Sequence, residues 1–280
     1  MFRVAEHDLG GAIRRTREHR GLTLRQLAAA LEVSAGTMSA IENNKVAVTV
    51  ERLNAIGAYL DVTAGALLRT DAIPNPTVKR PDDHWRQFDD LGLDPVLAAA
   101  VEVFTETGYH GATMRLVASA AGISVAGIYH HHRSKQHVLV ALFDAMLDEV
   151  CWRTAAAAAQ DNDPVASFAL MVEALALCHT ERRDLAFIAT TEMRSLEQPD
   201  RARIAGLRRH VQQQLDAAAL TAVSVGAFTT STPHNTGRAI ATMCMALPYW
   251  FSPAGPQTGA EVAAEYAALA LEMMGHHGSA

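Results

Sequence analysis

The 280-residue chain is 49% hydrophobic and 19% charged, with a formal net charge of −6 at pH 7. This length exceeds that of one typical domain, so we expect two or three globular domains, each with its own core. No apolar run approaches the roughly 20 residues that a membrane span needs, and the N-terminus MFRVAEHDLG lacks the apolar stretch of a signal peptide, so we expect a cytoplasmic protein. The acidic excess lies in residues 141–280, whereas residues 1–70 hold more basic than acidic side chains, which leaves room for a basic face there.

Apolar residues recur at spacings of three and four through most of the chain, and β-branched alternation is scarce outside residues 46–49. This periodicity predicts an all-α protein. Between residues 70 and 95, prolines and charges gather without a sustained apolar period, which predicts a linker with one short helical turn around Trp85. We therefore expect, in chain order, a five-helix domain at 1–70, the linker at 71–92, a three-helix domain at 93–140 and a helical bundle at 141–280.

The first domain is predicted to contain five short helices, at residues 9–19, 23–31, 34–43, 49–60 and 64–68. Each has a side chain at its start that can accept a backbone N–H, and these are Asp8, Thr23, Ser34, Thr49 and Thr63. The segment GLTLRQLAAALEVSAGTMSAIENNK resembles the Cro/Xre-type helix-turn-helix of phage repressors. The resemblance implies DNA binding, and it implies an internal ion pair of structural importance between Arg17 and Glu42.

The Cro/Xre resemblance places small side chains on the groove-facing side of the third helix, namely Ala35, Gly36, Thr37, Ser39 and Ala40. Direct base readout relies on Arg, Gln or Asn forming bidentate bonds, and this helix holds almost none of them. The chain also has Glu32 where the family's turn usually has glycine, and Leu24 where it often has a DNA-contacting glutamine. We therefore expect mainly phosphate contacts, made by Thr23, Arg25, Ser34, Asn43, Asn44 and Lys45. The alternative is a module kept for packing or partner contacts.

A second helix-turn-helix begins near Asp94. Its first helix is amphipathic and is expected to end at Gly108. Thr113 and Ser124 are predicted to cap the next two helices, with Gly122 supplying the turn between them. The segment FTETGYHGATMRLVASAAGIS, the tyrosine of GIYHHH and the Ser-Lys pair that opens the following helix resemble the TetR family DNA-binding domain.

The TetR resemblance implies two kinds of DNA contact. The residues implied to hold phosphates are Thr113, Tyr129, His131 and Lys135. The residues implied to lie toward base edges in the major groove are Ser124, Val125, Ala126, Gly127 and His130. Because residues 125–127 are small, we expect readout through methyl contacts, DNA shape and close backbone approach. Independently, an ammonium at the start of a helix adds to the positive end of the helix dipole, which suits Lys135 to a phosphate.

Other side-chain patterns argue against metal, redox or catalytic chemistry. Consecutive helical residues point about 100° apart, so the histidines at 130–132 cannot converge on one ion, and we expect no metal site. His132 stands where the TetR family usually has a core phenylalanine. The cysteines are widely spaced and odd in number, which predicts buried free thiols at Cys151, Cys178 and Cys244. Because the chain has no GxSxG, P-loop, HExxH or dinucleotide fingerprint, we expect neither an enzyme nor a cofactor.

The last segment is predicted to contain the helix that begins at Ser134 and four or five more, at residues 164–179, 181–196, 199–222, 235–250 and 259–274. The helix from Pro164 has more apolar residues than one core stripe needs, which fits a doubly buried core helix and a helix that borders a cavity equally well. The TetR resemblance implies an inducer pocket in this half and dimerisation through the last two helices. The segments TTEMRSLEQPDRARIAGLRRHV and ALPYWFSPAGPQTGAEVAAEYAALAL are similar to the TetR subgroup that responds to acyl-CoA thioesters or fatty acids.

The implied pocket is expected to have aromatic and methionine side chains, which adapt to flexible acyl chains, although methionine stripes also occur as plain core. The expected lining is Phe168, Met171, Leu175, Phe187, Met193, Met243, Tyr249 and Trp250. A phosphate or carboxylate is expected to meet Arg182, Arg183 or Arg194. The resulting hypothesis is a homodimeric repressor that holds a double-stranded DNA operator and is released by a small apolar effector such as an acyl-CoA or fatty acid. The alternative is that the N-terminal module serves protein interaction or dimerisation, and that only the TetR-type domain binds DNA.

Overall fold

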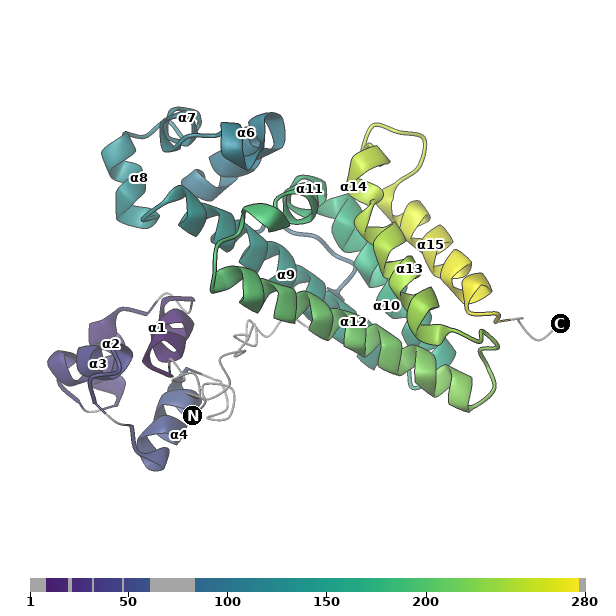
Figure 1. Ribbon diagram of the computed structural model, residues 1–280, viewed down its shortest axis with the longest axis horizontal. Helices are drawn as coiled ribbons and strands as arrows, with labels where there is room; N and C mark the ends of the chain where they lie inside the picture. The colour runs from purple at the N-terminus through teal and green to yellow at the C-terminus, as the bar shows by residue number, and fades with distance from the viewer. Residues whose placement is uncertain (1–8, 20–21, 32, 47, 61–83, 277–280) are drawn as a thin grey trace, which may run out of the picture. The chain divides into compact units, whose positions relative to one another are not determined.

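The computed structural model describes residues 9–19, 22–31, 33–46, 48–60 and 84–276 (Figure 1). The chain divides into two compact units, residues 1–80 and residues 81–280. Every regular element in the described part is helical, as the periodicity predicts. Within these ranges no helix combines the length and the apolar character needed to cross a membrane.

The first unit contains α1 (Leu9–His19), α2 (Leu24–Ala30), α3 (Ala35–Glu42) and α4 (Val50–Tyr59). Three predicted caps are confirmed, because the hydroxyls of Thr23, Ser34 and Thr49 each accept the backbone N–H three residues further on. Thr23 also forms a reciprocal capping box with Gln26. These caps satisfy donors that short helices otherwise leave open at their N-termini. Outside the described residues lie the predicted helix at 64–68, the cap candidates Asp8 and Thr63, and Glu32.

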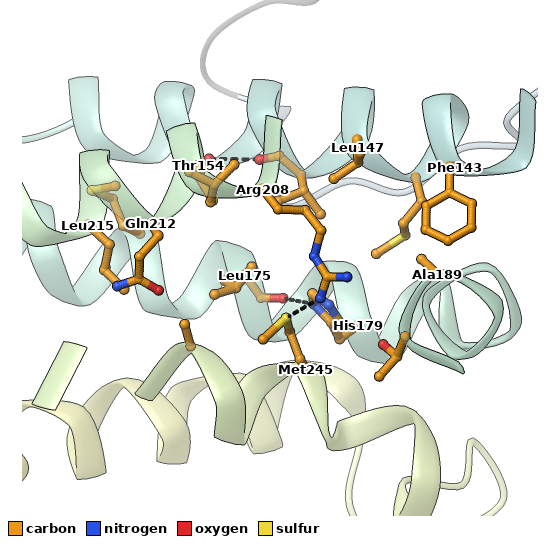
Figure 2. A pocket seen from close by; sticks show the side chains of 16 residues that line it. Phe143, Leu147, Thr154, Leu175, His179, Ala189, Arg208, Gln212, Leu215 and Met245 are labelled. Carbon is orange, nitrogen blue, oxygen red and sulfur yellow. Dashed lines mark hydrogen bonds between the residues drawn. The ribbon is translucent and has the colours of Figure 1, made fainter. Parts of the chain in front are cut away.

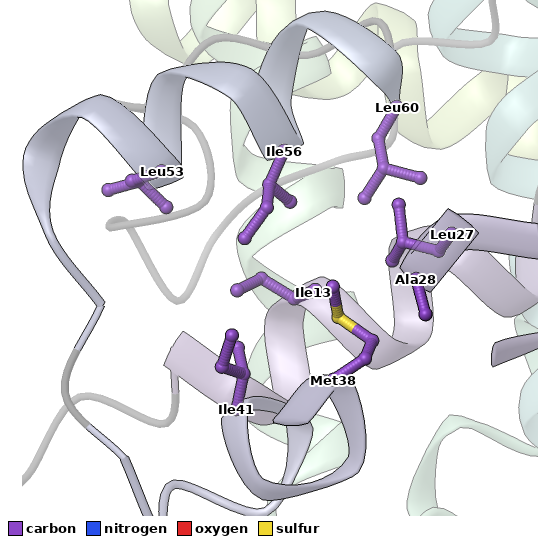
Figure 3. Packing of buried hydrophobic residues seen from close by; sticks show 8 residues of the cluster. All are labelled: Ile13, Leu27, Ala28, Met38, Ile41, Leu53, Ile56 and Leu60. Carbon is purple, nitrogen blue, oxygen red and sulfur yellow. The ribbon is translucent and has the colours of Figure 1, made fainter. Parts of the chain in front are cut away.

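A hydrophobic core holds the helices of the first unit together (Figure 3). Its buried members are Ile13, Leu27, Ala28, Met38, Ile41, Leu53, Ile56 and Leu60. Leu24, at the position where the resembling family often contacts DNA, packs half-buried against this core. The guanidinium of Arg17 forms a buried bidentate pair with Glu42, with N–O distances of 2.6 and 2.9 Å. The predicted internal ion pair is therefore confirmed, and it joins α1 to the end of α3.

The head of the second unit consists of α6 (Pro95–Gly111), α7 (Met114–Ala120) and α8 (Val125–His131). The predicted caps are confirmed, because Thr113 and Ser124 each accept a backbone N–H three residues on. Gly122 has a φ of 67° in the turn before α8, and Gly108 has a φ of 68° inside α6. Side chains other than glycine seldom adopt this conformation, so the two glycines fix the path of the chain at both turns. Gly108 bends α6 at the position where the sequence predicts its end, although the helix continues to Gly111.

Beyond the head, a bundle is formed by α9 (Lys135–Ala159), α10 (Pro164–Glu181), α11 (Arg183–Thr191), the 3-10 turn η2 (Met193–Ser195), α12 (Asp200–Ser224), α13 (Pro233–Met245), α14 (Leu247–Trp250) and α15 (Gly259–Met273). Two helices are shorter than predicted. The helix expected at 181–196 ends at Thr191, because the next residues tighten into η2. The helix expected at 235–250 ends at Met245 and resumes as α14, since Pro248 lacks the N–H that would continue α13.

Helix α10 is the central helix of the bundle and packs against α9, α11, α12, α13, α14 and α15 (Figure 1). All residues from Ala174 to Thr180 on this helix are buried. The sequence left open whether α10 is a core helix or borders a cavity, and both descriptions hold, because one of its faces lines the cavity described below. The cysteines are free as predicted, with Cys178 and Cys244 buried and Cys151 half-buried.

Residues 84–89, which we call the docked segment, pack against α9 and α10. Trp85 is fully buried, and its indole N–H donates to a glutamine side chain at the end of α9 at 2.8 Å. Arg86 forms a bidentate pair with Glu173 on α10, with N–O distances of 2.6 and 2.8 Å. From α9, Arg153 donates to the carbonyl of Trp85. The docked segment is therefore part of the packed second unit.

This packing changes one part of the predicted linker. The expected turn around Trp85 is present at residues 84–86, but its tryptophan is a core residue. Arg182, which was expected to meet a ligand, instead donates to the carbonyl of Asp89. Residues 71–83 of the predicted linker lie outside the described part of the chain.

Candidate nucleic-acid interface and cavity

The predicted DNA-facing residues of the head lie along α8, immediately before α7 and at the start of α9. The exposed ones are Thr113, Ser124, Val125, Ala126 and Tyr129, and Gly127 is half-buried. On the opposite side of α8, Ile128 is fully buried and anchors the helix in the head. For His130 and His131 the structure describes the α8 backbone and not the side chains. The head thus presents one face of α8 made of small side chains, bordered by a half-exposed tyrosine.

The stretch from Thr113 to Lys135 contains no acidic residue, although the whole protein carries a net charge of −6. Besides Lys135, its cations are Arg115 on α7 and Arg133 between α8 and α9, and both arginines are exposed. Sequence analysis missed these two arginines, and the lack of Asp and Glu around them was the signal that could have found them. A surface that combines cations with small side chains is suited to approach a phosphate backbone.

The side chain of Lys135 forms its hydrogen bonds within the head. Its ammonium donates to the carbonyls of Tyr109 and Ala112, at 2.6 and 2.7 Å, and lies 4.3 Å from the centre of the Tyr109 ring. Burial lowers the pKa of Lys135, while the nearby carboxylate of Glu192 raises it. Because two of the three ammonium hydrogens serve carbonyls at the end of α6, Lys135 closes the α6–α7 turn and has one hydrogen left for a phosphate.

His132 occupies a core position, as predicted. It is buried at the end of α8, and its Nε2 lies 2.9 Å from a carboxylate oxygen of Asp94, the residue that caps α6. Burial raises the pKa of Asp94. The N–H of Leu97 and the ring of His132 lower it by more than this, so that the pKa of Asp94 lies below the ordinary value. The pair therefore ties the end of α8 to the start of α6. Among the described residues, no group of His, Cys, Asp or Glu has the arrangement of a metal site.

In the first unit the predicted DNA contacts lie on α2, α3 and the turn after α3. The exposed ones are Thr23, Arg25, Ser34, Ala35, Gly36, Asn43, Asn44 and Lys45, and the half-buried ones are Thr37, Ser39 and Ala40. Asn44 has a φ of 54°, and its side-chain oxygen accepts the N–H of Gly10 at 2.7 Å. Asn44 therefore braces the end of α3 against α1. Arg25 and Lys45 are the exposed cations of this set.

A cavity of about 120 Å³ lies among five helices of the bundle (Figure 2). Its lining is mainly apolar and comprises Phe143, Met146, Leu147, Val150 and Thr154 of α9, Met171, Leu175 and His179 of α10, Ala189 and Thr190 of α11, Arg208, Val211, Gln212 and Leu215 of α12, and Ala241 and Met245 of α13. The α10 residues are spaced by four, so they share one face of that helix. The cavity is therefore bordered by residues far apart in the sequence.

Two of the predicted pocket residues, Met171 and Leu175, line this cavity. The predicted residues outside its lining are Phe168, Phe187, Met193, Met243, Tyr249, Trp250, Arg182, Arg183 and Arg194. The phenylalanine at 168 is buried against Phe228, with ring centres 5.2 Å apart. Because α10 is buried on all sides, apolar character alone could not separate its cavity face from its core faces.

The arginines predicted to meet a ligand have other positions. Arg182 contacts Glu149 at 3.3 Å and holds the docked segment. Arg183 donates to the carbonyl of Phe251 at 2.9 Å. Arg194 is exposed on η2. The prediction that these residues border the pocket is therefore corrected, because their guanidinium groups serve other contacts or face solvent.

Arg208 and His179 border the cavity from facing helices, and sequence analysis missed both (Figure 2). Arg208 donates to the sulfur of Met245 at 3.0 Å, and burial lowers the pKa of its guanidinium. The Nδ1 of His179 lies 2.7 Å from the carbonyl of Leu175. Burial, reinforced by the charge of Arg208, lowers the pKa of His179 to about 4, so this histidine is neutral at pH 7. In the sequence Arg208 stands beside an exposed arginine, and packing alone decides which of the two turns inward.

Two helices connect the cavity with the head. Helix α9 begins in the head at Lys135 and lines the cavity further along, between residues 143 and 154. Helix α11 lines the cavity through Ala189 and Thr190 and also packs against α6. These two helices therefore form a physical connection between the cavity and the head.

A buried hydrogen-bond cluster secures the contact between α11 and α6. Immediately after α11, the carboxylate of Glu192 accepts the backbone N–H of Tyr109 at 3.0 Å and the hydroxyl of Ser195 at 2.6 Å. The Tyr109 N–H follows the bend at Gly108, so Glu192 satisfies a donor at the point where α6 departs from regular helix. Glu192 thus links the segment after the cavity-lining α11 directly to the backbone of the head.

Three families match separate parts of the chain. Residues 161–274 match the family described as "Tetracyclin repressor-like, C-terminal domain", and residues 96–142 match "Bacterial regulatory proteins, tetR family". Residues 8–70 match "Helix-turn-helix domain". These matches coincide in turn with the bundle, the head and the first unit.

A curated relative, the HTH-type transcriptional regulatory protein RaaS of Mycobacterium tuberculosis, is 39% identical over 75 residues, which are 27% of this chain and 34% of that protein. This chain thus spans about a third of that relative's length. Among solved structures, the TetR family regulator PfmR from Thermus thermophilus is 29% identical, with a TM-score of 0.60 over 64% of this chain and 98% of that one. AibR, solved in complex with isovaleryl coenzyme A and operator DNA, is 22% identical, with a TM-score of 0.58 over 62% of this chain and 95% of that one, which shows a shared fold.

The matches agree with the geometry of the second unit. Its head and bundle carry the two TetR-type domains in order, and the similarity to PfmR extends over nearly the full length of that regulator. The relatives named above are transcriptional regulators and not enzymes, in line with the sequence prediction. The chain belongs to the TetR family of transcriptional regulators and carries an additional helix-turn-helix domain at its N-terminus.

Proposed function

We propose that the protein is a DNA-binding repressor whose hold on its operator is released by a small molecule in the bundle cavity. One observation carries this proposal: α9 and α11 both border the cavity and both contact the head. A ligand that fits better when these helices have shifted favours the shifted conformation. The heads then leave the spacing in which they fit the operator, and the extent of release follows from the ligand's difference in affinity for the two conformations.

On the DNA side, we propose that the start of α8 enters the major groove. The small residues 124–127 let the backbone approach closely, which favours readout of DNA shape and of thymine methyl groups. The exposed hydroxyls of Thr113 and Tyr129 are suited to donate to phosphates, and Arg115 and Arg133 add positive charge beside them. Base contacts by His130 and phosphate contacts by His131 and Lys135 complete the proposed interface.

The first unit is proposed to add phosphate contacts to those of the head. Among the described residues, its caps and its buried ion pair have the arrangement of a helix-turn-helix framework, which supports a DNA-binding role over one in protein interaction alone. Arg25 and Lys45 are exposed and are suited to phosphates, whereas the small residues of α3 offer few bidentate base contacts. This unit therefore extends and strengthens binding, while α8 selects the sequence.

A homodimer through α13 and α15 is part of the same proposal. Large apolar side chains are exposed on α15 at Leu269 and Met273, and at the end of α12 at Leu220 and Val225. A two-fold dimer would cover such surfaces and would present two α8 helices to two half-sites of one operator.

The effector is proposed to have an apolar body. The cavity lining is mainly aliphatic, and Met146, Met171 and Met245 supply flexible side chains that adapt to a guest. We include acyl compounds among the candidates, and two features support this choice: the similarity of two bundle segments to regulators that respond to acyl-CoA thioesters or fatty acids, and the isovaleryl coenzyme A bound by AibR.

Selection of binding sites from a random duplex pool with the full-length protein tests the DNA-binding part. The proposal predicts a two-fold-related site that binds at least about 10³ times more tightly than random duplex at physiological salt. Ala126→Val should change the preferred sequence, whereas Tyr129→Phe should weaken binding to all sequences similarly. Equal affinity for selected and random duplexes would contradict the proposal.

A further inference from the structure

The polar side chains that line the cavity differ in whether the protein satisfies them. Four of them already bond a protein oxygen at 2.7 to 2.8 Å, and these are Thr154, Thr190, Gln212 and His179. Arg208 is different. Within the described residues, its guanidinium donates a hydrogen bond to the thioether sulfur of Met245. A thioether sulfur is a weak acceptor, whereas a guanidinium carries five N–H donors. The cavity therefore contains a cation without an adequate protein partner.

A second arginine on the same helix, Arg203, has a carboxylate partner and serves as a comparison. Arg203 forms a bidentate pair with Asp144 at 2.7 and 3.0 Å, and although burial lowers its pKa, the carboxylate raises it above the ordinary value. For Arg208 burial alone acts, and it lowers the pKa. Arg208 is half-buried, and it is unfavourable to withdraw a charge from water without giving it a partner, so an anion beside Arg208 would reduce this cost.

Arg208 is also the group in the cavity suited to an anion. The Nδ1 of His179 faces a carbonyl, which can only accept, so this nitrogen carries the ring proton. The other ring nitrogen is then an acceptor and would repel an anion. The hydroxyls of Thr154 and Thr190 are already used as donors within their own helices. The positive charge available to a ligand therefore comes from Arg208.

The volume of the cavity limits the rest of the ligand. At about 120 Å³ it is slightly smaller than an engineered cavity of about 150 Å³ that takes up benzene. Its apolar lining suits a body of that size, such as one ring or a short branched chain. A long acyl chain would need considerably more space.

We infer that the effector is a compact organic acid whose carboxylate is bound by Arg208 and whose small apolar body fills the cavity. This inference rests on the proposed function and names the ligand class of its effector site. A carboxylate can take two parallel N–H bonds from one guanidinium, a geometry that a hydroxyl or a neutral amide does not match.

Isothermal titration of the full-length protein with matched probes tests this inference. Benzoate and benzyl alcohol share the ring and differ in charge, and we expect benzoate to bind at least tenfold more tightly. Arg208→Met keeps an unbranched, flexible side chain but removes the guanidinium, and it should abolish this preference. Arg209→Met, which removes the exposed neighbouring arginine, is the matched control and should leave it unchanged. If Arg208→Met fails to fold, the two probes on the unmodified protein still decide the question.

Several results would overturn the inference. Equal binding of benzoate and benzyl alcohol would do so, as would a preference that persists in a folded Arg208→Met protein. Isovaleryl coenzyme A or palmitate that binds and releases the operator where benzoate and isovalerate fail to bind would also overturn it, while leaving the proposed function standing. Benzoate that binds through Arg208 but leaves operator affinity unchanged would support the ligand class and contradict the proposed function.

Discussion

Two serines cap α3 and α8 in the same way. Ser34 immediately before α3 and Ser124 immediately before α8 each accept a backbone N–H three residues on, at 3.0 Å in both cases. Both modules have an internal tie, which in the head is the pair of His132 and Asp94, but the head is also linked to the bundle. In the first unit the buried pair of Arg17 and Glu42 ties α1 to α3 within the module. In the head, Glu192 reaches α6 from the segment that follows a cavity-lining helix.

Under the proposed function, this difference would give one module a constant role and the other a switchable role. We expect a module braced by its own residues to keep its geometry when the bundle changes. A head that is hydrogen-bonded to the bundle depends on the arrangement of α9 and α11, and a ligand between those helices can bias it. We therefore expect the first unit to bind DNA independently of the effector and the head to respond to it.

Breaking the internal brace should have the largest effect. Arg17→Ala leaves the Glu42 carboxylate buried and unpaired, which should destabilise the first unit by about 3–5 kcal/mol. Hydrogen exchange measures this, because amides of α1 to α4 should lose protection while those of α6 to α15 keep it. The double variant Arg17→Met with Glu42→Leu removes both charges and should recover most of the loss. Equal loss of protection in both units would contradict independent bracing.

Acid should act on the second unit through His179. Its pKa is lowered from 6.5 to about 4 in the folded bundle, so the unfolded chain takes up a proton at higher pH than the folded chain. The stability that depends on a neutral His179 is thus complete above pH 6.5 and is lost as the pH falls toward 4, by about 3 kcal/mol in all. Chemical denaturation across this range, with His179→Gln as the reference, isolates the contribution. A reference variant with the same pH dependence as the unmodified protein would contradict it.

Loosening the contact between α11 and α6 should uncouple the head from the cavity. Glu192→Gln replaces one of the two acceptor oxygens, which serve the N–H of Tyr109 and the hydroxyl of Ser195, and should cost about 1–3 kcal/mol of stability. It should also reduce the change in operator affinity that an effector causes. Glu197→Gln, an exposed carboxylate nearby, is the control. An effector response that survives Glu192→Gln in full would show that the hydrogen bonds of Glu192 do not carry the coupling.

The smallest expected effect is on the salt dependence of DNA affinity, and it compares the phosphate contacts of the two modules. Arg115→Gln in the head and Arg25→Gln in the first unit should each lower the slope of log affinity against log salt by about 0.9, the value for one phosphate contact. Both arginines are exposed, so neither change should affect folding. A reduced slope for Arg115→Gln alone would show that Arg25 does not contact a phosphate.

The parts of the fold that depend on local chemistry were predictable from the sequence. Thr113, Ser124 and Gly122 stand within a few residues of the helix ends that they define, so cap and turn rules located them. The Arg17–Glu42 pair followed from resemblance to a known motif and not from spacing. In both cases the information lies in a short stretch of chain or in a family pattern.

The cavity depends on how distant helices pack, and the sequence could not predict its lining. Phe168 and Met171 lie on the same helix and are both apolar, yet one packs against Phe228 and the other borders the cavity. For the same reason the sequence did not predict that Arg208 borders the cavity, because its helix carries many charged residues. The docked segment was also missed, because its few apolar residues are buried only by contact with α9 and α10.

The most direct test of coupling between cavity and head needs no knowledge of the effector. Ala189 lines the cavity on α11, and Ala189→Phe adds a ring of the size that the cavity can hold. Operator affinity, measured by fluorescence anisotropy, should fall at least tenfold in this variant, while Ala202→Phe at an exposed position of α12 should leave it unchanged. Unchanged affinity in an Ala189→Phe protein whose crystal structure shows the ring inside the cavity would contradict the account.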